Sequence, residues 1–191
     1  MIIGICFIAQ LAIPGFQDIF IFNPHALLPW MFITSIFLHG GITHLLFNSL
    51  ALIMFGPYLE RILGSKLFAV FFLLAGVAGS ALFFLTIYFG IIPSVSALGA
   101  SGAIFGILGA LSVLMPSLVV YMYFFPVPIR VATVLWFIIE TVGAFNPNSG
   151  IASAAHVGGL LFGILFGLYY KNKIRAGPVP VSDKWYSTYL R

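Results

Sequence analysis

The chain has 191 residues, of which 62% are hydrophobic and only 6% are charged, and its mean hydropathy is +1.16. Soluble domains carry about 25% charged residues, so this composition excludes a soluble enzyme or binding module and indicates a membrane protein. The net charge is +4, but the basic and aromatic residues form no nucleic-acid-binding motif. We therefore expect the lipid bilayer as a partner and no nucleic acid.

Six hydrophobic blocks follow one another along the chain. They cover residues 1–21, 39–60, 67–90, 97–115, 131–146 and 151–170. A membrane-spanning helix needs about 17–25 apolar residues, and the fifth block, with prolines before it, fits this length least well. Lipid-exposed backbone must satisfy its own hydrogen bonds, so runs of this kind form helices. We predict an all-α membrane protein with a six-helix transmembrane domain over residues 1–171 and a polar tail over 172–191.

The distribution of basic residues predicts the orientation. With six spans and a cytoplasmic N-terminus, every Lys and Arg falls on the cytoplasmic side, as the positive-inside rule requires. These residues are Arg61, Lys66, Arg130, Lys171, Lys173, Arg175, Lys184 and Arg191. The first block has no basic residue before it and no small-residue cleavage pattern after it, so we expect a retained helix rather than a signal peptide. The prediction is a multi-pass protein of the cell (inner) membrane with both termini cytoplasmic.

Four polar residues are expected at one depth in the membrane. His44 and Asn48 lie near the start of the second block, Ser101 near the start of the fourth, and His156 near the start of the sixth. These three blocks run in the same direction in the predicted topology. At 1.5 Å rise per helical residue, the four side chains share a layer on the order of 6–15 Å below the outer surface.

Glycines explain how this layer can close. The fourth block contains Gly102-x-x-x-Gly106, and the sixth contains Gly159-x-x-x-Gly163. Such small-residue faces let membrane helices approach until their backbones nearly touch. If the two faces meet, Ser101 and His156 meet as well.

A serine beside a histidine permits nucleophilic catalysis, because a neutral imidazole can take the proton of the hydroxyl. Backbone N–H groups at the start of the fourth helix, with His44 and Asn48, could stabilise the oxyanion that forms. The chain's acidic residues are Asp18, Glu60, Glu140 and Asp183. None of them is at an evident triad position, so we expect a Ser–His dyad. For Glu140, in the fifth block, three roles stay open: reaching the outer surface, bonding a neighbouring helix, or gating.

At this point the sequence resembles the rhomboid family of intramembrane serine proteases. The motifs that carry the resemblance are Gly99-Ala100-Ser101-Gly102, His44-x-x-x-Asn48, Gly56 with Glu60 and Gly64, and His156 in "AAHVGGLLFG". The similarity covers about residues 26–170. Any one motif is weak, but all four in order, each on the expected span, are highly specific. In having no further domain and no seventh span, the sequence resembles the basic prokaryotic form of this family.

The resemblance implies a fold, an activity and roles for matching residues. Ser101 would be the nucleophile and His156 the general base, while Asn48, His44 and the Ser101 amide would form the oxyanion site. Gly99 would leave room for substrate backbone. The substrate would be a transmembrane segment of another protein, cut near its outer end. The chemistry needs no metal and no cofactor, and the sequence gives no indication of the oligomeric state.

The resemblance also implies roles for flanking segments. Residues 146–150 would cap the site, the fifth span would be the lateral gate, and the first loop would be partly immersed in the membrane. Two positions depart from the family pattern. Met31 replaces an arginine common after the loop tryptophan, and Phe105 replaces a common tyrosine and would still pack on His156.

Other classes fit less well. An intramembrane metalloprotease would need an H-E-x-x-H motif, which the chain lacks. An intramembrane aspartyl protease would need two facing aspartates, but the two aspartates of this chain lie in the first loop and the tail. A transporter would predict inverted repeats and ionisable residues along a path through the membrane. A catalytically inactive rhomboid relative would typically lack the serine or the histidine. A rhomboid-type protease remains the best interpretation.

Overall fold

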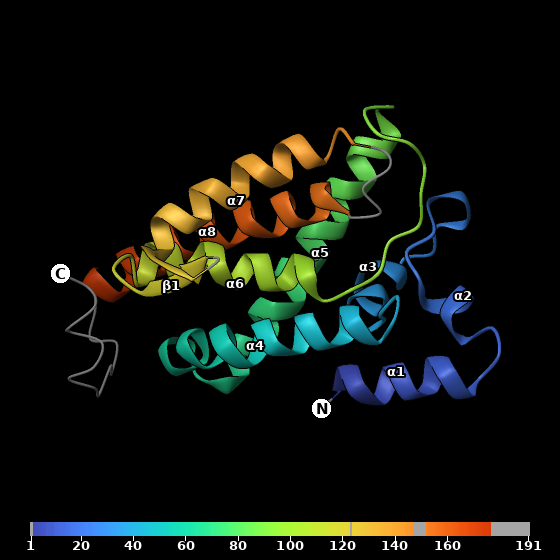
Figure 1. Ribbon diagram of the computed structural model, residues 1–191, viewed down its shortest axis with the longest axis horizontal. Coiled ribbons are helices and arrows are strands. Elements are labelled where there is room, and N and C mark those ends of the chain that lie inside the picture. The colour runs from blue at the N-terminus through green and yellow to red at the C-terminus, as the bar shows by residue number, and fades with distance from the viewer. Residues whose placement is uncertain (1, 123, 147–151, 177–191) are drawn as a thin grey trace.

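The computed structural model describes residues 2–122, 124–146 and 152–176. Within these residues the chain forms eight α-helices, two 3-10 turns and one β-hairpin (Figure 1). In chain order the elements are α1 (Ile2–Ala12), α2 (Phe16–Phe20), η1 (Pro24–Ala26), α3 (Met31–Thr34), η2 (Ser35–Phe37), α4 (Ile42–Leu63), α5 (Ser65–Tyr88), α6 (Ser101–Leu114), β1 (Val119–Met122), β2 (Phe125–Pro128), α7 (Ile129–Gly143) and α8 (Ser153–Ala176).

The helical membrane class is confirmed, whereas a count of six spans is not. Among the described residues, α4, α5 and α8 are long and apolar enough to cross a bilayer, and α1 and α6 are shorter apolar helices. Helix α6 has 14 residues, which corresponds to a length of about 21 Å. The hydrocarbon core is about 30 Å thick, so α6 does not extend through all of it.

The first hydrophobic block is not one helix, in contrast to the prediction. Helix α1 ends at Ala12, and a turn through Pro14 and Gly15 leads into the short helix α2. Gly15, which directly precedes α2, has φ +76°, a left-handed conformation that favours glycine. The Gln10 side chain accepts a hydrogen bond from the His39 amide at 2.9 Å and donates one to the His39 carbonyl at 3.1 Å. These two bonds fix α1 against the start of α4.

The fourth block also differs from the prediction, because its helix begins at Ser101 and not near residue 97. The segment before it is extended and pairs with the first loop. Phe22 and Ala97 exchange backbone hydrogen bonds of 3.1 and 3.0 Å, and the Gly99 amide donates to the Ser35 carbonyl at 2.9 Å. The paired backbone therefore holds the residues that lead into α6.

The structure adds a hairpin that the sequence analysis did not predict. Strands β1 and β2 connect α6 to α7 and pair antiparallel, with Val119 opposite Pro128 and Met122 opposite Phe125. At the other end of the chain, α8 continues to Ala176, beyond the predicted domain end at residue 171. The remainder of the predicted tail, residues 177–191, lies outside the described residues.

Small residues bring α6 and α8 into backbone contact, and the two helices run side by side in the same direction (Figure 1). A Cβ added at Gly159 would overlap the carbonyl of Gly102, and one added at Gly163 would overlap the carbonyl of Gly106. A Cβ at Gly106 would lie 3.2 Å from the Gly159 carbonyl oxygen. The small-residue stripes are therefore a steric requirement of this packing.

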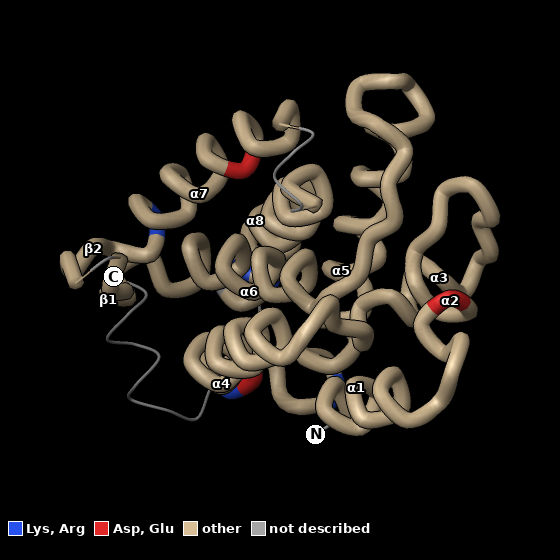
Figure 2. The backbone as a smooth tube through the Cα atoms, turned by 45° about the vertical axis from the view of Figure 1, so that its right-hand side comes forward, with Lys and Arg blue, Asp and Glu red and all other residues tan. Residues whose placement is uncertain are grey.

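The basic residues that the structure describes, blue on the backbone in Figure 2, lie at the ends of α4 and α8 and at the starts of α5 and α7. Arg61 lies in the last turn of α4, and Lys66 and Arg130 are the second residues of α5 and α7. Lys171 of α8 donates to the carbonyl of Val113, near the end of α6, at 3.3 Å. The first residue of α6, Ser101, lies at the opposite end of that helix.

Candidate active site

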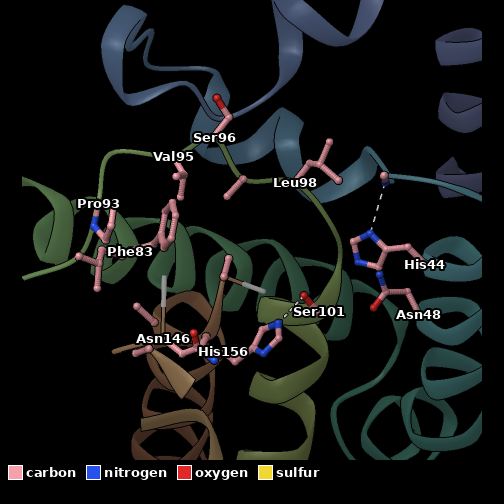
Figure 3. Close-up of a pocket in the computed structure, with 17 residues that line it drawn as sticks. His44, Asn48, Phe83, Pro93, Val95, Ser96, Leu98, Ser101, Asn146 and His156 are labelled. Carbon is pink, nitrogen blue, oxygen red and sulfur yellow. Dashed lines mark hydrogen bonds between the residues drawn. The ribbon is translucent and has the colours of Figure 1, made fainter. Parts of the chain in front are cut away.

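Ser101 and His156 face each other between α6 and α8 (Figure 3). The distance from Ser101 Oγ to His156 Nε2 is 2.7 Å. Ser101 is the first residue of α6 and His156 the fourth of α8. Because the two parallel helices touch through their glycines, residues one turn or less from their starts come to the same height. The hydroxyl is thus within hydrogen-bonding distance of an imidazole nitrogen that can accept its proton.

The imidazole of His156 is held by an aromatic side chain. Its ring stacks on the ring of Phe105, with centroids 4.5 Å apart and planes 8° from parallel. His156 is only 8% exposed. The expected packing of Phe105 on His156 is therefore confirmed, and it fixes the plane in which the imidazole lies.

His44 presents a nitrogen whose protonation is defined by a backbone contact. The Gly40 amide donates to His44 Nδ1 at 3.3 Å. In a neutral imidazole one ring nitrogen accepts while the other carries the proton. His44 Nε2 is therefore the donor, and it lies 2.9 Å from the point where a Cβ of Gly99 would be. The donor thus lies beside the backbone that leads to Ser101.

Asn48 lies on the same side of α4, four residues after His44 (Figure 3). Its side chain is buried, and Nδ2 has no hydrogen-bond partner among the described residues. A buried, unpaired amide donor typically costs about 1–3 kcal/mol. A buried donor without a protein partner calls for an explanation, such as a bound water or a catalytic role.

Gly99 has two structural reasons to be glycine. Its φ is +125°, and a Cβ there would lie 2.7 Å from His44 Cε1. A side chain would therefore strain the backbone and displace the His44 ring. These constraints apply in addition to the room for substrate backbone that the family resemblance implies.

The first turn of α6 contributes backbone donors. The first four N–H groups of a helix have no acceptor within it, and Ser101 and Gly102 provide the first two of α6. Together with His44 and Asn48, these amides give the site hydrogen-bond donors from two helices. Among the described residues no acceptor already occupies Nδ2 of Asn48.

The four polar residues share one cavity of about 640 Å³. It is lined by Ser101, His156, His44 and Asn48, by the extended segment before α6, and by residues that flank the ends of α7 and α8. Asn146, the first residue of the predicted cap, contributes to this lining. Residues 147–150 of that cap lie outside the described residues. A second cavity of about 30 Å³ next to Ser101 is lined in part by Ser35 and Ser80.

One acidic residue, for which the sequence analysis found no evident triad position, lies beside the site. Glu140 Oε2 lies 3.0 Å from His156 Nδ1, on the side of the ring away from Ser101. Of the roles left open for Glu140, contact with a neighbouring helix is therefore confirmed. Glu140 lies about one turn before the end of α7, as His156 lies about one turn after the start of α8. Because consecutive helices run antiparallel, equal distance from the connecting loop was the signal for this contact.

Met31, the departure in the first loop, is buried. It is 2% exposed and packs in a cluster with Phe22 and Phe83. The neighbouring Trp30 donates from Nε1 to the Ile19 carbonyl at 3.2 Å. The loop is thus fixed by apolar packing and by this hydrogen bond.

Comparison with known proteins agrees with these motifs. The Rhomboid domain family model matches residues 28–173. The chain is 40% identical over 136 residues to Rhomboid protease GluP of Bacillus subtilis, covering 70% of this chain and 24% of that protein. It is 32% identical over 166 residues to Rhomboid protein 1, mitochondrial, of Saccharomyces cerevisiae, covering 81% of this chain and 46% of that protein.

The chain therefore spans less than half the length of these two curated relatives. It is also 38% identical over 82 residues, 43% of this chain and 22% of the relative, to Inactive RHOMBOID-like protein 8 of Arabidopsis thaliana. The family model covers most of the chain, including every motif residue of the site. The chain belongs to the rhomboid family.

Proposed function

We propose that this protein is an intramembrane serine endopeptidase that cleaves transmembrane segments of substrate proteins near the outer membrane face. Ser101 is the nucleophile and His156 the general base. The observation that carries the proposal is the 2.7 Å contact between Ser101 Oγ and His156 Nε2 inside a cavity that the polar residues of three helices line. Intramembrane polar groups are costly, so a cluster of them supports a functional site.

The proposed reaction begins with attack of Ser101 Oγ on the scissile carbonyl carbon. The hydroxyl proton passes to His156 Nε2, and the carbonyl oxygen becomes an oxyanion. The C–N bond then breaks, and the imidazolium returns the proton to the leaving amine. The products of this half-reaction are the amine fragment and an acyl ester on Ser101.

The oxyanion needs donors that are already in place before the charge develops. His44 Nε2–H, Asn48 Nδ2 and the first amides of α6 supply them. The unpaired state of Asn48 Nδ2 among the described residues supports this role, because a donor without a ground-state partner gains its bond only when the oxyanion forms.

Hydrolysis of the acyl ester needs water, which His156 deprotonates as it attacks the ester carbon. The bond from that carbon to Ser101 Oγ then breaks, the imidazolium returns the proton to Oγ, and the carboxylic acid fragment leaves. A cavity of about one probe sphere or more with polar walls holds a water molecule. The cavity beside Ser101 has about 30 Å³ and includes the hydroxyl-bearing residues Ser35 and Ser80 in its lining. Its position supports a water supply next to the ester.

The position of the site relative to the charged end supports cleavage at the outer face. Ser101 lies at the end of α6 away from the basic residues, which we assign to the cytoplasmic side under the positive-inside rule. We place the protein in the cell (inner) membrane with cytoplasmic termini. A substrate helix must unwind to expose its carbonyl, so small or helix-breaking residues near its outer end favour cleavage.

A reaction with a serine-directed fluorophosphonate probe tests the proposal. The detergent-solubilised protein is labelled, and Ser101→Ala and His156→Ala abolish labelling. Ser112→Ala is the matched control, because Ser112 lies on the same helix and its hydroxyl, within the described part of the chain, donates to the Gly109 carbonyl at 2.7 Å. This control retains wild-type labelling.

The same test separates the rival interpretations. An inactive relative that acts by binding alone would not be labelled at all, and neither would a transporter. Labelling that survives Ser101→Ala would remove Ser101 from the mechanism. Mass mapping of the adduct to residue 101 completes the assignment.

A further inference from the structure

The His156 ring has polar neighbours at both of its nitrogens. Ser101 Oγ lies 2.7 Å from Nε2, and Glu140 Oε2 lies 3.0 Å from Nδ1. The second contact has the length of a hydrogen bond but not its alignment, so Nδ1 has no hydrogen-bond partner by angle among the described residues. Catalytic hydrogen bonds are often poorly aligned in the free enzyme and tighten when substrate binds.

The location of Glu140 does not fit a role in which its carboxylate simply reaches water at the outer surface. Its side chain is 13% exposed, and the His156 side chain 10%. Most of α7 is apolar, and exposed hydrophobic residues such as Ile138, Ile139 and Val142 lie on either side of Glu140 in the sequence. A carboxylate in such surroundings is costly unless it is paired. Among the described residues, the groups that reach it are His156 and the Ser153 side chain, which is within hydrogen-bonding reach.

We propose that Glu140 is a positioning residue that turns the Ser–His pair into a Ser–His–Glu arrangement. This inference rests on the proposed protease function and deepens it. The carboxylate accepts from Nδ1–H and so selects the tautomer in which Nε2 is free to take the Ser101 proton. When that proton arrives, the same carboxylate stabilises the imidazolium. Glu140 itself keeps its charge throughout and touches no reacting atom.

The arrangement joins three helices. The nucleophile comes from α6, the base from α8 and the carboxylate from α7. The stack of Phe105 fixes the plane of the imidazole, and Glu140 fixes its rotation within that plane. The two contacts restrict different motions of the ring, so loss of one is not replaced by the other.

Glu140→Gln and Glu140→Ala test the proposal, with Thr141→Val as the matched control. Thr141 is the next residue on α7, is half-buried, and among the described residues donates to the Phe137 carbonyl of its own helix, at 2.7 Å. Two rates are measured for each variant. One is cleavage of a transmembrane reporter in proteoliposomes, and the other is labelling by a small fluorophosphonate, which needs no lateral opening of the bundle.

We expect both Glu140 variants to lower kcat by about 10- to 100-fold, with KM changed by less than about 2-fold and labelling slowed in parallel. This is less than the roughly 10⁴-fold loss seen when the acid of a fully aligned triad is neutralised. Thr141→Val keeps wild-type rates. Melting temperatures are compared first, and if Glu140→Ala does not fold, the isosteric Glu140→Gln carries the test.

Two results would overturn the proposal. Unchanged labelling with slowed reporter cleavage would assign Glu140 to substrate access through α7, because the small probe would then bypass its role. Unchanged rates in both assays would leave the Ser–His pair sufficient. Either result leaves the proposed function intact, because that function fails only if wild-type protein is unlabelled or Ser101→Ala is still labelled.

Discussion

Helices α6 and α7 are nearly equal in length, but they are built for different tasks. Helix α6 has 14 residues, of which ten are buried, and α7 has 15 residues, of which three are buried. Five of the ten buried residues of α6 are glycine or alanine, and these small residues allow its backbone to touch that of α8. Helix α7 lies at the outside of the bundle (Figure 1). Its contacts to the site run through single large side chains, Trp136 to Phe105 and Glu140 to His156.

This difference separates a fixed part of the site from an adjustable one. The nucleophile and the base are on helices whose separation is set by backbone contact, so their distance changes only if the bundle comes apart. The carboxylate is on a helix that exposes hydrophobic side chains and has little buried surface, so its position depends on a few side-chain contacts. Elements of low contact density are those that open at the lowest free energy.

The largest effect is expected from a side chain added between α6 and α8. Gly159→Val would push a Cβ into the Gly102 carbonyl, and backbone on both sides cannot yield. We expect a loss of more than about 3 kcal/mol of stability, beyond the usual range for overpacking, measured as thermal unfolding in detergent. Gly4→Val is the control, because nothing lies within 4 Å of a Cβ there. Equal melting temperatures for both variants would show that α6 and α8 are not in backbone contact.

Asn48→Ala tests the oxyanion donors, which lie on α4 beside the fixed pair of Ser101 and His156. Removal of one such donor typically costs about 2.7–4 kcal/mol of transition-state stabilisation, and His44 as a second donor places the expected loss at or below the lower end. Turnover should fall while KM stays nearly constant, because the bond forms only in the transition state. A loss confined to KM would instead place Asn48 in ground-state binding.

Trp136→Ala gives the smallest of these effects and sharpens the comparison. Trp136 packs edge-on against Phe105 with ring centroids 6.4 Å apart, and lipid can fill part of the space it leaves. We expect a stability loss of about 1–2 kcal/mol. This is smaller than the loss expected for Gly159→Val, although Trp136→Ala removes a whole indole and Gly159→Val adds only three carbons. Thermal unfolding of the two variants side by side measures this. A larger loss for Trp136→Ala would reverse the assignment of fixed and adjustable parts.

The sequence predicted those features that depend on composition along one segment. Long apolar runs identified α4, α5 and α8, and the glycine stripes led to the expectation that Ser101 and His156 approach each other. The break in the first block was missed because hydrophobicity outweighed the local effect of Pro14 and Gly15. The start of α6 was missed because the positive φ of Gly99 is a property of the backbone pairing around it.

Features that depend on two segments were harder to predict. The hairpin β1–β2 lies between the predicted fourth and fifth blocks, and its two four-residue strands are defined only by their pairing with each other. The contact of Glu140 with His156 joins two antiparallel helices and needs the heights of both residues. The depth comparison of the second, fourth and sixth blocks does not include the fifth block, which carries this carboxylate.

The most direct test of the central claim is cleavage of a transmembrane reporter by purified protein in proteoliposomes. The reporter carries small and helix-breaking residues near the outer end of its spanning segment. Wild-type protein and Ser112→Ala are expected to cut within that region, and Ser101→Ala is expected to give no product. Cleavage by Ser101→Ala at the wild-type rate and position would contradict the account.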